Sequence, residues 1–128
     1  MKLLLDTNAL IWWLRDEDKL GRAARALITD SDSRVLVSMV SLWEVTMKWR
    51  VGKMGYTGSS LLDDLESQHI APLQITDEHL IALNSVEMYH KDPFDHLIIA
   101  QAKVEGATII TSDRVFTEYG VRCFPAGR

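Results

Sequence analysis

Two acidic residues follow short apolar runs of the kind that form buried strands. Asp6 comes directly after KLLL, and Asp113 comes after TIIT and Ser112. In an open parallel sheet, ligands bind beyond the carboxyl ends of the strands, so both carboxylates are expected at the same edge. Each acid also precedes a helical segment, and aspartate is a favoured N-cap, so helix capping is an alternative explanation for either residue alone.

A third acid, Asp95, lies in the segment DPFDHLIIAQAKVEG. The pattern predicts a helix with Asp92 as N-cap, Pro93 as the first helical residue and Asp95 two positions later, where both acids suit the positive end of the helix dipole. The residues that follow are apolar nearly all round, which predicts a buried helix whose N-terminus opens at the interior edge of the fold. An ionised carboxylate at that place favours a nearby cation.

The fourth acid, Glu44, belongs to the predicted helix SLWEVTMKWRVGK. An exposed pair with Lys48 at i,i+4, worth a few tenths of a kcal/mol, is one explanation for it. The apolar residues around Glu44 leave the helix little polar surface, so we expect this carboxylate near the edge of the core instead.

If the four acids lie close together in the fold, they predict a site for a cation. Two unit charges about 4 Å apart repel by about 4 kcal/mol at an effective dielectric constant of about 20, so unpaired carboxylates do not assemble without compensation. A divalent cation compensates them, and oxygen ligands favour Mg²⁺ or Mn²⁺, whereas zinc would call for histidine or cysteine. Such a site suits metal-assisted hydrolysis of phosphodiesters.

Strands and helices alternate along the chain, which predicts an α/β fold with a central parallel sheet of four to five strands. Pro72 favours an edge position for one of the weaker strands. Residues 52–60, rich in glycine and serine, are predicted to form a flexible loop. The expected strands are 2–5, 35–37 and 108–111, with weaker ones at 70–74 and 121–124, and the expected helices are 8–14, 20–29, 41–51, 60–68, 77–87 and 94–105.

Composition narrows the class of protein. The length of 128 residues predicts one domain, 1–128, and a net charge of −4 argues against a basic module that binds nucleic acid through its surface field alone. A single cysteine excludes an internal disulfide, and no apolar run approaches the roughly 20 residues of a membrane helix. We therefore expect a cytoplasmic protein without a membrane partner.

The remaining side chains allow weaker predictions. We expect Trp43 in the core, Trp12 and Trp13 partly at a surface that binds a partner, and Cys123 as an inert, buried thiol. Three histidines without metal-ligand spacing are interpreted as surface or helix residues, namely His69, His79 and His90.

Four segments of the chain, in this order and with suitable spacing, resemble the PIN-domain ribonucleases, specifically the VapC toxins of bacterial and archaeal toxin–antitoxin pairs. They are LLLDTNALIWWL, SMVSLWEVTMKWRVGK, HKDPFDHLIIAQAKVEGATIITSD and RVF, and the likeness runs from Met1 nearly to the C-terminus. The resemblance implies a three-layer α/β/α sandwich, commonly dimeric, with the active groove near the dimer interface.

The resemblance also implies roles for individual residues. Asp6, Glu44, Asp95 and Asp113 match the four acids of the family and would form the catalytic Mg²⁺ or Mn²⁺ pocket, with Asp6 and Asp95 as the most direct ligands. Small polar residues beside these acids would orient them. These are Thr7, Asn8 and Ser112.

His96 departs from the family pattern, because related chains usually carry arginine after this aspartate. A neutral imidazole attracts phosphate less, so contacts to RNA would depend more on basic residues elsewhere. Candidates are Lys48, Arg50, Lys53 and Arg114; the first three could equally form a solvated helix end that complements the helix dipole.

The implied function is that of a metal-dependent endoribonuclease toxin that leaves a 5′-phosphate and a 3′-hydroxyl and is inhibited by a cognate antitoxin. Two alternatives stay open: a binding module with vestigial acids, which the intact acid set disfavours, and a structure-specific DNA nuclease, whose relatives generally carry additional DNA-clamping elements. The absence of GxxxxGK[ST] and GxGxxG disfavours a nucleotide-dependent enzyme.

Overall fold

The computed structural model describes residues 1–128 and contains one sheet of four parallel strands in the order β2-β1-β3-β4. The predicted strand at 70–74 is wrong, since only an isolated bridge between Ser38 and Leu73 forms there. Pro72 has no N–H with which to extend a ladder. The strands are β1 (Lys2–Leu5), β2 (Arg34–Val37), β3 (Thr108–Thr111) and β4 (Cys123–Pro125).

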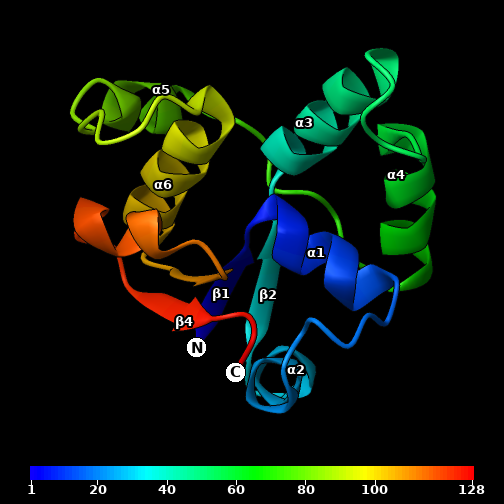
Figure 1. The fold of residues 1–128 in the computed structure, drawn as a ribbon. Helices are drawn as coiled ribbons and strands as arrows, with labels where there is room; N and C mark the ends of the chain where they lie inside the picture. The colour runs from blue at the N-terminus through cyan, green and yellow to red at the C-terminus, as the bar shows by residue number, and fades with distance from the viewer.

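Helices cover both faces of the sheet, which confirms the predicted three-layer arrangement (Figure 1). On one face lie α1 (Thr7–Leu14), α2 (Arg22–Thr29) and α4 (Gly58–Ser67), and on the other lie α5 (Asp77–Leu83), α6 (Pro93–Glu105) and the 3-10 helix η1 (Arg114–Tyr119). Helix α3 (Met39–Arg50) packs into both layers. The segment predicted as a helix over 77–87 ends at Leu83, four residues early.

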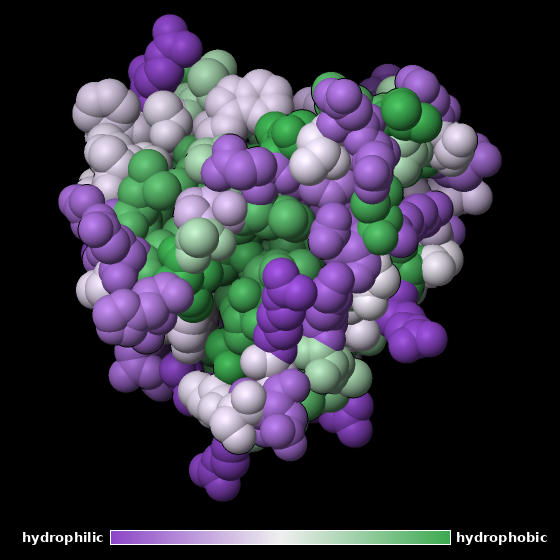
Figure 2. All heavy atoms as spheres, turned by 180° about the vertical axis from the view of Figure 1, so that it is seen from behind, coloured by the Kyte–Doolittle hydropathy of each residue, from purple (hydrophilic) through white to green (hydrophobic).

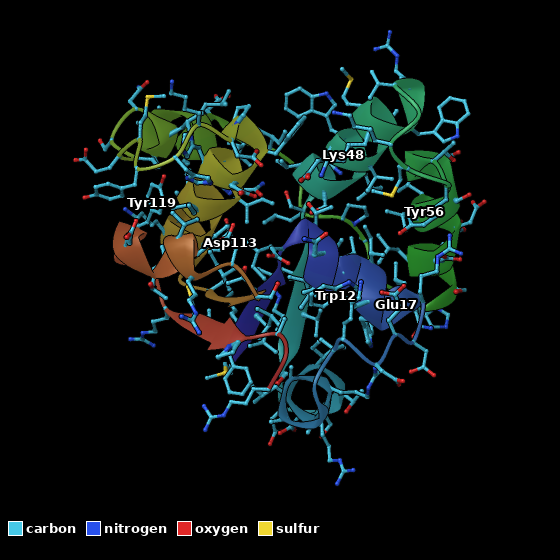
Figure 3. All side chains as sticks on the ribbon, viewed as in Figure 1. Trp12, Glu17, Lys48, Tyr56, Asp113 and Tyr119 are labelled. Atoms are coloured by element: carbon cyan, nitrogen blue, oxygen red, sulfur yellow. The ribbon has the colours of Figure 1, made fainter.

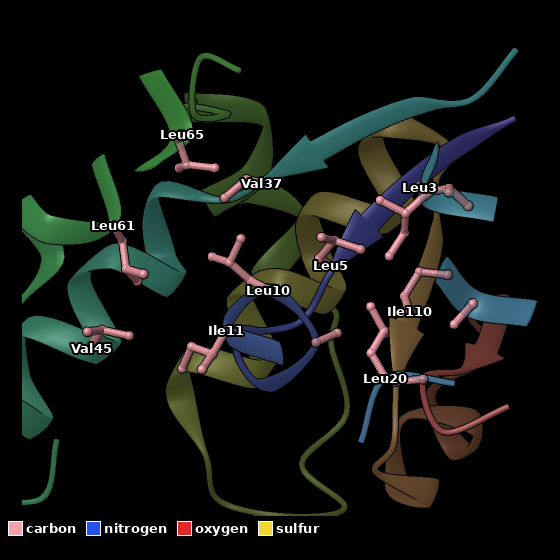
Figure 4. Packing of buried hydrophobic residues seen from close by; sticks show 14 of the residues in the cluster. Leu3, Leu5, Leu10, Ile11, Leu20, Val37, Val45, Leu61, Leu65 and Ile110 are labelled. Atoms are coloured by element: carbon pink, nitrogen blue, oxygen red, sulfur yellow. The ribbon is translucent and has the colours of Figure 1, made fainter. Parts of the chain in front are cut away.

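The alternation of side chains along the strands divides the core into two halves. Leu3 and Leu5 of β1 join Ile110 of β3 on the face covered by α1, α2 and α4, as Figure 4 shows. Leu4 and Ile109 point the other way, towards α6 and η1. Because both faces of the sheet are buried, the strands consist mostly of apolar residues in continuous runs. Polar side chains that serve a site are therefore found at the ends of the strands.

The prediction that Trp43 lies in the core is wrong. Trp43 is 49% exposed, because the turn of α3 that directs Glu44 and Val45 inwards leaves position 43 outside, where it stacks edge-on against Phe94. His79 lies in helix α5, one of the two alternatives expected for it, and is fully buried; it completes the capping box of α5, and its Nε2 lies 3.0 Å from a carboxylate oxygen of Glu105.

The predicted flexible loop at 52–60 is also corrected, since α4 begins inside it at the buried Gly58. A Cβ at this position would lie 2.3 Å from the Thr46 hydroxyl oxygen, so the glycine allows α4 to approach α3 closely. Cys123 in β4 is half-buried rather than buried, and this burial raises the pKa of its thiol.

Apolar residues are not confined to the core. On the face opposite to that of Figure 1, they are visible in the middle of the surface with polar residues around them (Figure 2). Trp12 and Trp13 are partly buried and pack against the core. None of the helices combines the length and apolar character required to cross a membrane.

Candidate functional site

A pocket of about 140 Å³ opens where β1 and β3 end and where α1 and α6 begin, with α3 alongside. All four acids singled out in the sequence contribute to it. Figure 3 shows Lys48 on α3 and Asp113 near η1, on the two sides of the start of α1. The lining consists of Asp6, Thr7, Asn8, Glu44, Lys48, Asp92, Asp95, Asp113 and Phe116.

Asp6 is both a helix cap and a pocket residue. One carboxylate oxygen accepts a hydrogen bond from Ala9 N at 2.8 Å, which caps α1, and the other accepts one from the Thr111 hydroxyl at 2.5 Å. The side chain is almost fully buried, and this burial raises the pKa of Asp6 to about 6, with smaller contributions from the charges of Glu44 and Asp113. Asp6 therefore caps a helix and also contributes a carboxylate to the pocket, so both explanations offered by the sequence apply.

Glu44 lines the pocket and is buried. Its Oε1 accepts a hydrogen bond from the Thr7 hydroxyl at 2.7 Å, and its Oε2 accepts one from Lys48 Nζ at 2.6 Å. The expected i,i+4 pair exists, but its carboxylate is buried rather than exposed. The contact raises the pKa of Lys48, to which the charges of Asp92 and Asp95 also contribute, so its ammonium is the positive charge inside this acidic pocket.

Asp95 enters the pocket from the first turn of α6. Asp92 caps this helix by accepting from the backbone N–H groups of Phe94 and Asp95. The pKa of Asp95 is raised to about 7, chiefly by burial and to a smaller extent by the charges of Asp92 and Glu44, while a hydrogen bond from His90 lowers it. The distance between His90 Nε2 and Asp95 Oδ2 is 3.1 Å.

Asp113 lies at the exposed mouth of the pocket and caps η1 by accepting from Val115 N at 3.0 Å. Its own N–H donates to the Thr111 hydroxyl oxygen, whose proton goes to Asp6. One threonine at the end of β3 thus connects two of the acids.

The other predicted residues lie at different distances from the acids. Asn8 lines the pocket, whereas Ser112 and Arg114 line a neighbouring cavity of about 270 Å³ that shares Asp113. Arg50 and Lys53 are exposed and line neither cavity.

Three residues of the site region were not singled out in the sequence as functional. Asp92 was interpreted only as an N-cap and Thr111 only as a strand residue, although both stand at element ends on the edge predicted for the acids. His90 is predicted from the sequence only as a surface or helix residue; it lies outside the helices and is half-buried against Asp95. Its position two residues before the helix cap was the available signal. His96 is buried and bonded to Tyr119, away from the pocket lining.

The donor set suits a hard divalent cation, since it consists of carboxylate and hydroxyl oxygens that crowd negative charge into a small space. As the side chains lie, no group of three or more His, Cys, Asp or Glu residues has the geometry to hold a metal ion. Several carboxylate oxygens face protein donors instead, but each oxygen has a second lone pair. Five carboxylates share this pocket with a single ammonium, that of Lys48, so the residues fit such an ion chemically.

The family model of the PIN domain matches residues 3–121. The chain belongs to the PIN-domain family. This assignment agrees with the parallel sheet and with the pocket at its carboxyl edge. A comparison with curated proteins returned no match.

Solved structures share the fold of this PIN domain over nearly its whole length. VapBC2 from Rickettsia felis, bound to a DNA fragment from its promoter, matches with a TM-score of 0.73 and 16% identity, covering 97% of this chain and 98% of the other. DNA-bound VapBC from Salmonella typhimurium gives 0.69 and 20%, with 97% of each chain covered. FitAcB from Neisseria gonorrhoeae gives 0.59 and 17%, again with 97% of each chain covered. At these identities the likeness concerns the fold.

Proposed function

We propose that this chain, as a single PIN domain spanning 1–128, is a Mg²⁺- or Mn²⁺-dependent endoribonuclease and the toxin of a toxin–antitoxin pair in the cytoplasm. PIN domains in general are nucleases. The observation that carries the proposal is a pocket of about 140 Å³ with five carboxylates, two of which have pKa values raised to about 6 and about 7. Such crowding of acids is unfavourable for folding and is explained by the binding of a cation.

Asp6 and Asp95 are proposed as the most direct metal ligands, with Glu44 and Asp113 acting directly or through water. A divalent ion held there would lower the pKa of a water molecule and neutralise charge that develops on a phosphodiester. The protein contributes the orientation of the acids, because Thr7 holds Glu44 through its hydroxyl. The negative lining also keeps unaccompanied anions out, so substrate and metal are expected to bind cooperatively.

Basic residues around the pocket are proposed to hold the RNA backbone. Lys48 lines the pocket itself, and Arg114 lines the adjoining cavity that shares Asp113. A phosphate at the mouth would thus meet one ammonium and one guanidinium, which suits a strand that runs from one cavity to the other. Arg50 and Lys53, exposed at and beyond the end of α3, are proposed to contact more distant phosphates.

The decisive experiment is cleavage of an end-labelled RNA oligonucleotide with and without Mg²⁺ or Mn²⁺. We expect cleavage that requires the metal, stops with EDTA and leaves a 5′-phosphate and a 3′-hydroxyl. Asp95→Asn should abolish it, while Asp63→Asn, at an exposed position of α4 away from the pocket, should leave it intact. Intact cleavage by Asp95→Asn would refute the assignment, and absence of cleavage with binding alone would favour the binding module.

A 2′-deoxy oligonucleotide of the same sequence distinguishes an RNase from a DNA nuclease of related chemistry. We expect it to resist cleavage, whereas cleavage of both strands at similar rates would favour the DNA nuclease.

An antitoxin and a second copy of the chain are the proposed protein partners. The structural neighbours are VapBC and FitAB complexes, in which a PIN-like chain is associated with an antitoxin. The exposed side chains of Trp43 and Trp49, each 49% accessible on α3, offer apolar surface for such contacts. Co-expression with the product of a short reading frame immediately upstream should relieve growth inhibition, and light scattering should give twice the chain mass.

A further inference from the structure

Four side chains next to the pocket form a continuous hydrogen-bonded chain that ends on Asp95. His90 Nε2 lies 3.1 Å from Asp95 Oδ2, and His90 Nδ1 lies 2.5 Å from the Tyr119 hydroxyl oxygen. The same oxygen lies 3.2 Å from His96 Nε2 and accepts the backbone N–H of His90 at 3.1 Å. Figure 3 shows Tyr119 on the 3-10 helix beside α6. Segments before, within and after α6 therefore meet at one phenol.

Groups that can only accept hydrogen bonds determine the direction in which protons are donated along this series of side chains. An ionised carboxylate can only accept, so His90 must donate from Nε2 to Asp95, and a neutral imidazole then presents Nδ1 as an acceptor. The Tyr119 proton goes to that Nδ1. The phenol oxygen keeps two lone pairs, which accept the His90 backbone N–H and the Nε2–H of His96. The three side-chain protons of this series, on His96 Nε2, the Tyr119 hydroxyl and His90 Nε2, are then donated in succession towards Asp95.

We propose that His90 and Tyr119 are positioning residues for Asp95: Tyr119 holds His90 in its Nε2–H tautomer, so that His90 ties one oxygen of Asp95 and leaves the other for the pocket. His96 completes this series of hydrogen bonds at its far end by donating from Nε2 to the Tyr119 oxygen. The inference rests on the proposed function only in treating Asp95 as a metal-holding acid. Fixing the second partner of a histidine or carboxylate in this way is worth roughly 10- to 100-fold in metal affinity at known sites.

Because these groups are buried, each depends on the others for its hydrogen bonds. Tyr119 and His96 are buried, and His90 is 21% exposed, so water cannot easily replace a missing partner. The rings of His90 and His96 also pack edge to face at 4.9 Å, and Tyr119 packs against both. Rotation of the His90 ring would break two hydrogen bonds at once.

The first test reads the tautomer directly in the metal-free protein by long-range ¹H–¹⁵N correlation of the histidine rings, above about pH 8, where Asp95 is ionised. We expect the Nε2–H form for His90 in the wild-type chain and a mixture of tautomers in Tyr119→Phe. Tyr89→Phe is the matched control, since Tyr89 stacks on Tyr119 but is 58% exposed, and it should leave the His90 signals unchanged. An Nδ1–H or doubly protonated His90 in the wild type would overturn the proposal.

The second test measures Mn²⁺ affinity by electron paramagnetic resonance. Tyr119→Phe should bind Mn²⁺ about 10-fold more weakly than the wild type and Tyr89→Phe. In a His90→Gln background, where an amide donates to Asp95 without help from the phenol, the added Tyr119→Phe change should have no further effect.

The outcomes separate this inference from the proposed function. A wild-type chain that does not bind Mn²⁺ refutes the proposed function. Mn²⁺ binding that is equally strong in the wild type and Tyr119→Phe refutes the positioning role alone. Thermal unfolding of each variant identifies any loss that comes from misfolding, and the His90→Gln series keeps the test valid if Tyr119→Phe is unstable.

Discussion

Replacing Asp6 with asparagine should change stability in opposite directions at low and at neutral pH. Burial raises the pKa of Asp6 from its ordinary value of 3.8 to about 6, so the folded state disfavours the ionised form. This shift corresponds to a loss of about 3 kcal/mol in the free energy of unfolding when Asp6 is ionised. The penalty is absent below the unfolded-state pKa, where the carboxyl is protonated in both states; it grows as the pH rises between the two values and is complete above the folded-state pKa.

Asparagine avoids this penalty but loses one interaction. Its oxygen can still accept from Ala9 N, whereas its amide cannot accept the proton of Thr111, which costs about 1 kcal/mol. We therefore expect metal-free Asp6→Asn to be about 1–2 kcal/mol more stable than the wild type near about pH 8, and about 1 kcal/mol less stable near about pH 3.

Urea unfolding in EDTA at both pH values measures this reversal. Asp63→Asn, an exposed change on α4, should stay within about 0.5 kcal/mol of the wild type at either pH. With Mg²⁺ at about 100 times its dissociation constant, the wild type should gain about 2.7 kcal/mol and the Asp6 variant much less. A variant that is less stable than the wild type at both pH values would show that Asp6 is not electrostatically strained, and the reasoning would fail.

Three further predictions concern the pocket and its supports. Lys48→Met should destabilise the metal-free protein by about 1–3 kcal/mol, because it leaves the buried Glu44 without its ammonium; urea unfolding should show a smaller loss in excess Mg²⁺ and little effect of the exposed change Lys53→Met. Gly58→Ala should lower the free energy of unfolding by about 1–3 kcal/mol, because the new Cβ would lie 2.3 Å from a threonine hydroxyl of α3, and should leave the unfolding slope unchanged. Mn²⁺ affinity, measured by titration, should rise with pH until Asp95 is ionised, near about 7, and level off above it; affinity independent of pH between about 5 and 8 would exclude this carboxylate as a ligand.

The strands and the edge on which the acids lie could be predicted from the sequence because these features are local. Runs such as KLLL and TIIT are apolar on both sides, and in a parallel sheet their carboxyl ends share an edge, so Asp6 and Asp113 are placed by chain order alone. The N-cap interpretation and the pocket interpretation proved compatible, because the turn from a strand into a helix points its capping carboxylate at that edge.

The errors occurred where long-range contacts outweigh local pattern. Trp43 follows the apolar pattern of its helix but lies outside, since α3 packs its other sides against two layers. The helix position of His79 agrees with one of the two alternatives expected for it, but the burial of His79 and His90 has no local signal; their partners, Glu105 and Tyr119, lie 26 and 29 residues away. Local sequence patterns cannot predict partners that are so distant along the chain.

The amino-acid sequence by itself determined which residue types stand at the strand ends and helix starts, because strand and helix periodicity act over a few neighbouring residues. Only the tertiary structure decided how those residues interact. The hydrogen bond from Thr111 to Asp6 spans 105 residues, and the one from Thr7 to Glu44 spans 37. The raised pKa values of Asp6 and Asp95 follow from burial, and burial depends on which distant segments pack around a carboxylate and remove its water.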